Sequence, residues 1–177
     1  MLFRSRMAQA LDVILRFFKG EIVTEKTDWY EFVNARAHIL PYQQPHPEVA
    51  VVSAVTPSGG RLAGKYGLSM IAVAATNPFG YDALAANWKI ATDTAAETGH
   101  TMDPANLRLV GPMHIAETRA QAYENAKYGI EAYLGCLNNN QPRFIVPKGK
   151  DAAEWFVESK FGVIGTDWKS TRLNSSH

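Results

Sequence analysis

The chain has 177 residues, of which 46% are hydrophobic and 20% are charged, and its formal net charge is +1. This composition is typical of a globular protein, and the even charge balance argues against a nucleic-acid surface, which needs a basic patch. A single cysteine, Cys136, excludes an internal disulfide and is expected to pack inside a helix of a cytoplasmic protein. No run reaches the roughly 18 apolar residues of a membrane span, so no membrane partner is expected.

The first segment predicts an amphipathic helix that ends at Gly20. Charged residues occupy one face, and apolar residues recur at helical spacing on the other, namely Met7, Leu11, Ile14, Leu15 and Phe18. Residues 21–47 have no helical period, and prolines crowd their end. We therefore expect two short extended pieces around Asn34, followed by an extended loop.

The most informative part of the sequence is a strand that runs into a helix start. The apolar run at residues 49–55 predicts a buried strand, Thr56 is a candidate N-cap, and Pro57 suits a first helical position. The first amides of a helix lack internal partners and carry partial positive charge, so they attract anions. Together with the hydroxyls of Thr56 and Ser58 they predict a phosphate site. The same residues also fit an ordinary strand-to-helix turn without a ligand.

Strands and helices alternate along the rest of the chain. Apolar runs predict strands at 68–75, 107–115 and 161–165, the second interrupted by a Gly-Pro pair; helical spacing predicts helices at 81–98, 117–137 and 151–160, with a polar loop at 138–143. This alternation predicts an α/β fold with mostly parallel strands. A closed (β/α)₈ barrel needs about 250 residues, so the chain is too short to form one.

The sequence offers few candidates for catalysis. His114 is the only histidine on a predicted strand near its end, where a general acid or base is conceivable, although a partly buried structural histidine explains it as well. No group of His, Cys, Asp and Glu has the spacing of a metal site, so none is expected. The catalytic residues therefore stay unknown at this point.

The order of PYQQPHPEVAVVSAVTPSGGRLAGKYGLSMIAVAATN, a long helix, NLRLVGPMHIAET, another helix and FGVIGT resembles the flavin-dependent monooxygenases of the bacterial luciferase-like family, in particular its alkanal and limonene monooxygenases. The resemblance implies that residues 1–166 are the C-terminal portion of an incomplete TIM (β/α)₈ barrel, without the N-terminal half that carries the family's usual catalytic histidine. It also implies that FMN is bound by Val55, Thr56, Ser58, Gly59 and Ala74, the last of them beside the isoalloxazine ring.

The activity implied by this resemblance uses reduced FMN, supplied by a separate flavin reductase, and dioxygen to oxidise a small aldehyde, ketone or terpene-like substrate. The full-length form is then expected to be a homodimer. Two alternatives stay open: a deazaflavin-dependent oxidoreductase of the same superfamily, and a non-catalytic α/β module that binds a phosphate-bearing ligand. Residues 167–177 break the family pattern, and KSTRLNSSH resembles a translated sequencing adapter, so this tail is expected to be non-native and to make few apolar contacts.

Overall fold

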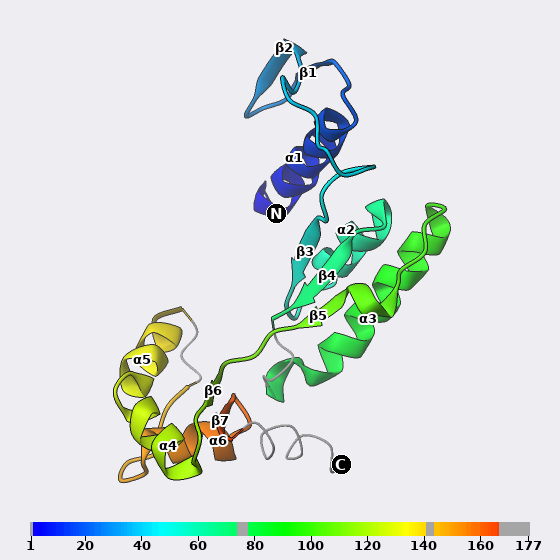
Figure 1. Ribbon diagram of the computed structural model, residues 1–177. Coiled ribbons are helices and arrows are strands. Elements are labelled where there is room, and N and C mark those ends of the chain that lie inside the picture. Colours follow the sequence, from blue (N-terminus) through cyan, green and yellow to red (C-terminus); the bar gives the residue numbers. More distant parts are fainter. Residues whose placement is uncertain (1, 74–77, 141–143, 167–177) are drawn as a thin grey trace. The chain divides into compact units, whose positions relative to one another are not determined.

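The structure is a computed structural model that describes residues 2–73, 78–140 and 144–166 (Figure 1). The chain divides into two compact units, and each is described on its own: Met1–Ile71 with Asn87–Arg108 form the first, and Ala72–Ala86 with Leu109–His177 form the second. The predicted tail at 167–177 and the predicted ligand contact Ala74 lie outside the described residues.

The first unit begins with the predicted amphipathic helix and a hairpin. Helix α1 (Leu2–Phe18) ends before Gly20, which has a φ of 79°. Its buried face differs slightly from the prediction, because Val13 is buried while Ile14 is 43% exposed. Strands β1 (Val23–Lys26) and β2 (Glu31–Ala35) follow and pair antiparallel. The sequence did not predict β1, since Val23 is its only large apolar residue.

The centre of the first unit is a sheet in the order β3-β4-β5, formed by β3 (Ala50–Ser53), β4 (Ser69–Ala72) and β5 (Leu107–Leu109). Helix α2 (Ser58–Tyr66) connects β3 to β4, and α3 (Tyr81–Glu97), flanked by the 3₁₀ turns Pro78–Gly80 and Pro104–Asn106, connects β4 to β5. Such helical crossovers are the connections that parallel strands require. They place the apolar core between the sheet and its helices: Leu15, Val51, Leu62, Ala63, Leu68, Met70, Ala91, Ala95 and Met102.

Two glycines let α2 pack closely against α3. A Cβ added to Gly60 would lie 2.5 Å from the carbonyl oxygen of Asn87, and a Cβ on Gly64 would clash with the carbonyl oxygen of Ala91. Both neighbours are backbone atoms, which cannot turn aside as a flexible side chain can. The start of α2 is therefore held close to the middle of α3.

The second unit contains the parallel pair β6 (Met113–Ile115) and β7 (Val163–Gly165), in which Met113 lies opposite Val163. Three helices complete it: α4 (Arg119–Lys127), α5 (Ile130–Asn140) and α6 (Ala152–Glu158), the last capped by Asp151. Their contacts with the strands form a second apolar core: Ala122, Ile130, Leu134, Phe144, Ala152, Ala153, Phe156, Phe161 and Ile164.

Three predictions need correction in this part of the chain. The strand predicted at 107–115 is two strands in different sheets, because the chain changes its pairing partner at the Gly111-Pro112 pair: Val110 N still donates to the carbonyl oxygen of Ala72, whereas the carbonyl oxygen of Pro112 accepts from Val163 N. The helix predicted at 117–137 is broken between α4 and α5, and α5 extends to Asn140 into the predicted polar loop. Cys136, predicted to pack inside a helix, is exposed on α5.

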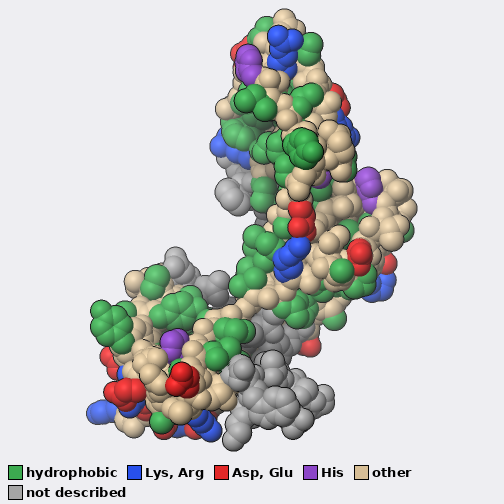
Figure 2. Space-filling view, viewed as in Figure 1, with side chains coloured by type: hydrophobic (Ala, Val, Ile, Leu, Met, Phe, Trp, Pro, Cys, Tyr) green, Lys and Arg blue, Asp and Glu red, His purple; other side chains and the backbone are tan. Residues whose placement is uncertain are grey.

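Hydrophobic side chains reach the surface of both units (Figure 2). Val52 is 58% exposed because it points to the face of β3 opposite to that of the buried Val51 and Ser53. Met113 and Ile115 of β6 are likewise 64% and 46% exposed. Among the described residues, no helix is both long enough and apolar enough to cross a membrane.

Candidate functional site

The predicted phosphate loop lies between β3 and α2, as the sequence indicated. Strand β3 ends at Ser53 and α2 begins at Ser58, so residues 54–57 form a short exposed connection. Pro57, with φ −70° and ψ −6°, stands before the helix, and no side chain caps its first amides. The prediction that Thr56 caps the helix is therefore wrong by one position, and the uncapped amides are left open to another acceptor.

Two hydroxyl groups converge at this helix start. The Oγ1 atom of Thr56 and the Oγ atom of Ser58 lie 3.0 Å apart and share one hydrogen bond, in which either can be the donor. One hydroxyl proton is then left for an external acceptor. Ser58 also lines a hollow of about 240 Å³ together with Arg61 and Lys65 of the same helix. A hydrogen bond with Tyr66 raises the pKa of Lys65, which favours its charged form. Hydroxyls, amides and cations together suit an anionic group.

Gly59 has a packing role that the sequence did not suggest. A Cβ at this position would lie 2.7 Å from the carbonyl oxygen of Val52 and 2.9 Å from Cα of Ser53. The missing side chain therefore allows α2 to pack on β3, and a larger residue would displace the helix. The amide of Gly59 as a phosphate donor stays a prediction, as does the role of Val55, which is 53% exposed.

Two buried polar residues beside the loop were missed by the sequence reasoning. Ser53 is 2% exposed, and its Oγ has no hydrogen-bond partner among the described residues. Asn87 is 3% exposed, and its Nδ2 donates to the carbonyl oxygen of Ala54 at 2.9 Å. One signal was available, because Asn87 lies one helical turn before Ala91 on the apolar face of α3.

His114, the weak catalytic candidate, lies on β6 in the second unit. It is half-buried, and its Nε2 is enclosed without a hydrogen-bond partner in the part of the chain that the structure describes. It contributes to the wall of a largely apolar hollow of about 310 Å³, together with residues that include Met113, Tyr133 and Phe156. A general acid or base needs a nitrogen that the reacting group can reach, so this geometry offers no support for catalysis, and the role stays a prediction.

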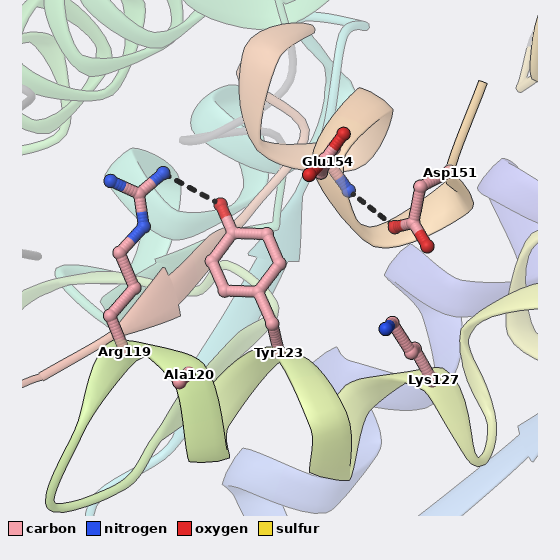
Figure 3. A pocket seen from close by; sticks show the side chains of 6 residues that line it. All are labelled: Arg119, Ala120, Tyr123, Lys127, Asp151 and Glu154. Atoms are coloured by element: carbon pink, nitrogen blue, oxygen red, sulfur yellow. Dashed lines mark hydrogen bonds between the residues drawn. The ribbon is translucent and has the colours of Figure 1, made fainter.

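A charged cleft of about 380 Å³ lies between α4 and α6 in the same unit (Figure 3). Two of its charged groups form hydrogen bonds within or at the start of these helices. Arg119 Nη2 donates to the hydroxyl of Tyr123 at 3.2 Å, and Asp151 Oδ1 accepts from the amides of Ala153 and Glu154. The cleft therefore offers no support for a catalytic site between these helices. Across the described ranges, no three His, Cys, Asp or Glu side chains gather as metal ligands.

Comparison with known proteins identifies close sequence relatives. The family described as luciferase-like monooxygenase matches residues 2–165. Limonene 1,2-monooxygenase from Rhodococcus erythropolis is 43% identical over 92% of this chain and 42% of its own length. The 4-hydroxyprotoasukamycin monooxygenase from Streptomyces nodosus subsp. asukaensis is 41% identical over 92% of this chain and 46% of its own length. The chain thus spans less than half the length of these curated relatives.

Solved structures show the same fold at lower sequence identity. The oxygenating constituent of 3,6-diketocamphane monooxygenase from Pseudomonas putida, in complex with FMN, aligns with a TM-score of 0.63 at 22% identity, over 86% of this chain and 47% of that one. An F420-dependent secondary alcohol dehydrogenase, in complex with an F420-acetone adduct, aligns with a TM-score of 0.58 at 18% identity, over 93% of this chain and 49% of that one. On the strength of the sequence matches, the chain belongs to the luciferase-like monooxygenase family.

Proposed function

We propose that this chain forms the FMN phosphate-binding part of a flavin-dependent monooxygenase. The observation that carries the proposal is the pair of hydroxyls on Thr56 and Ser58, 3.0 Å apart beside the uncapped first turn of α2. A phosphate group needs several donors and a positive environment, and a helix N-terminus with neighbouring hydroxyls provides both. The complex of a structural neighbour with FMN supports this assignment.

The residues around the loop fit a phosphate group. Ser53 presents a buried hydroxyl without a partner among the described residues, directly beneath the first turn of α2. Arg61 follows Ser58 by one helical turn and lines the same hollow, so it adds positive charge on that face. When phosphate binds, the hydrogen bond between the two hydroxyls would open, so that Thr56 and Ser58 both donate to the phosphate oxygens. The amides of Ser58 and Gly59 would do the same.

The reaction follows from the family and from the cofactor. Bound reduced FMN supplies the chemistry that activates dioxygen for transfer to a small aldehyde, ketone or terpene-like substrate. The part played by this chain is to hold the phosphate and thereby fix the position of the ring. Val55 and Ala74 are proposed to line the flavin site. A separate flavin reductase supplies the reduced cofactor, and the assembled enzyme is a homodimer in this proposal.

A second candidate is a deazaflavin-dependent oxidoreductase that transfers hydride without oxygen. The specific observation that favours it is the F420-dependent alcohol dehydrogenase among the structural neighbours. The loop of Thr56 and Ser58 would serve either cofactor, because both carry phosphate. The sequence relatives, both named as monooxygenases, favour FMN.

The proposal also covers the arrangement of the chain. Residues 1–166 form part of a (β/α)₈ barrel, its C-terminal portion, in which β3, β4 and the later strands are barrel strands. Residues 167–177 lie outside this domain. The family match over residues 2–165 and the helical crossovers between β3, β4 and β5 support the first statement.

The activity is tested in a chimera, in which residues 2–165 replace the matching segment of the Rhodococcus limonene 1,2-monooxygenase. Oxygen uptake and substrate oxygenation are measured with reduced FMN, generated by an added reductase, and with reduced F420. The proposal expects oxygenated product with reduced FMN only. Hydride transfer with F420 and no oxygen uptake would establish the second candidate instead. A folded chimera that uses neither cofactor would contradict both.

A further inference from the structure

Asn87 holds the backbone at the point where β3 turns into the phosphate loop. Its side chain is buried in the first unit, and its Nδ2 donates a hydrogen bond of 2.9 Å to the carbonyl oxygen of Ala54. Ala54 is the first residue after β3 and directly precedes residues 55–58. A single side chain of α3 therefore fixes the direction in which the loop leaves the sheet.

The same residue also contacts the far end of the loop. The carbonyl oxygen of Asn87 lies where a Cβ on Gly60 would come within 2.5 Å, so the first turn of α2 is seated directly on it. Asn87 thus contacts the loop at Ala54, before the hydroxyl pair, and at Gly60, after it. These two contacts set the spacing between the strand end and the first amides of the helix.

An asparagine is an unexpected choice for this position on packing grounds alone. The face of α3 that carries Asn87 continues with Ala91 and Ala95, both buried in the apolar core. A buried amide must recover its lost hydration through hydrogen bonds, whereas an apolar side chain has no such requirement. At this position the amide donates a hydrogen bond that holds the Ala54 carbonyl in place, which an apolar side chain could not do.

We propose that Asn87 is a positioning residue that keeps the loop from Ala54 to Ser58 in the conformation that binds the flavin phosphate. This inference rests on the proposed function, because it assigns a second layer of residues to the same site. The side chain of Asn87 acts through Ala54, its main-chain carbonyl contacts Gly60, and neither touches the phosphate. Its substitution should therefore alter the recognition of phosphate more than the recognition of the flavin ring.

The test compares FMN with riboflavin, which lacks the phosphate, in both the full chain and the chimera. Asn87→Leu keeps nearly the shape of the side chain and removes the donor without adding a charge, and Asn87→Ala removes the whole amide. Each is expected to weaken FMN binding by about threefold to tenfold, the size of one lost neutral hydrogen bond. Riboflavin binding should change less than about twofold. In the chimera, the apparent KM for reduced FMN should rise while kcat changes little.

The chain offers a matched control on the same pair of helices. Thr98, just after α3, has its Oγ1 within hydrogen-bond distance of three carbonyl oxygens: those of Thr94 at 2.9 Å and Ala95 at 3.2 Å in α3, and that of Gly64 near the other end of α2 at 3.3 Å. Thr98→Val removes that contact between α3 and α2 without touching the loop. It is expected to lower the melting temperature but to leave the ratio of FMN to riboflavin affinity unchanged.

The outcomes separate this inference from the proposed function. If Asn87→Leu and Asn87→Ala weaken FMN and riboflavin equally, or lower only the melting temperature as Thr98→Val does, the positioning role is wrong. If Thr56→Ala and Ser58→Ala change the ratio while the Asn87 variants do not, only this inference fails. If none of the four changes the ratio, the phosphate site itself is wrong and both fail. Should Asn87→Ala not fold, Asn87→Leu, whose side chain is close to asparagine in shape, decides.

Discussion

Arg108 and Glu48 form a two-pronged ion pair across the sheet of the first unit, although they lie sixty residues apart in sequence. Nη1 of Arg108 is 2.5 Å from Oε1 of Glu48, and Nη2 is 2.9 Å from Oε2. Ser69 Oγ donates to the same Oε1 at 2.6 Å. Glu48 precedes β3, Ser69 begins β4, and Arg108 is in β5, so one carboxylate connects all three strands.

This connection predicts a pH dependence of stability. The hydrogen bond from Ser69 and then the one from Arg108 hold the pKa of Glu48 below its ordinary value. A carboxyl with a lowered pKa in the folded state contributes stability above its unfolded pKa and loses it as the pH falls through the folded pKa. Urea denaturation between pH 7 and pH 3 should therefore show a smaller loss for Glu48→Gln than for the wild type. Parallel curves for the two proteins would show that Glu48 makes no such contribution.

Alanine substitutions at two glycines should have opposite effects on stability, because one glycine lies in the contact between α2 and α3 and the other lies on an open helix surface. Gly64→Ala places a methyl group against the carbonyl of Ala91 and should reduce the free energy of unfolding by about 1–3 kcal/mol. Gly135 on α5 has nothing within 4 Å of an added Cβ, so Gly135→Ala is the matched control. It should increase stability by up to about 1 kcal/mol, because alanine favours the helix. Equal effects of the two changes, measured by urea denaturation, would contradict the close contact.

The surroundings of Tyr30 predict that its hydroxyl loses its proton at a higher pH than an ordinary tyrosine does in an alkaline titration. Its hydroxyl donates to Glu25 Oε1 at 2.5 Å, and burial, followed by this hydrogen bond, raises its pKa to about 12. A tyrosine with a raised pKa stabilises the fold below its ordinary pKa of 10.0, and this contribution is lost as the pH rises toward 12. When tyrosinate absorbance is followed as the pH rises, the component that appears at the highest pH should be absent in Tyr30→Phe. The fully exposed Tyr128 provides the control, since Tyr128→Phe should keep that component.

The sequence was sufficient to locate the turn between β3 and α2, because its signals are local. A β-branched run followed by Thr-Pro-Ser-Gly marks the end of β3 and the start of α2 within a few residues. The helices α1, α3 and α6 were predictable for the same reason, since helical spacing and a terminal glycine or aspartate define each one.

Long-range contacts were not predictable from local patterns. The partner of Asn87 is a carbonyl 33 residues away, and its amide gives no sequence signal beyond a polar residue on an apolar helix face. The division of residues 107–115 into β5 and β6 depends on which strand each segment pairs with, which periodicity does not reveal. The sequence suggested a ligand contact at Gly59, but it gave no sign that Gly59, Gly60 and Gly64 of α2 each make room for a neighbouring backbone.

The phosphate site is tested most directly by comparing FMN and riboflavin binding in Thr56→Ala and Ser58→Ala. Each change removes one hydroxyl donor that would face a charged oxygen. A hydrogen bond to a charged group contributes about 1.5–3 kcal/mol, so FMN affinity should fall about tenfold or more in each variant. Titration calorimetry or flavin fluorescence measures both ligands, in the full chain and in the chimera.

Riboflavin carries the same ring without the phosphate and is therefore the internal control of this measurement. The account predicts that FMN affinity falls in both variants while riboflavin affinity stays nearly unchanged. Equal losses for FMN and riboflavin would mean that Thr56 and Ser58 shape the fold or the ring pocket and do not hold a phosphate, which would contradict the central claim.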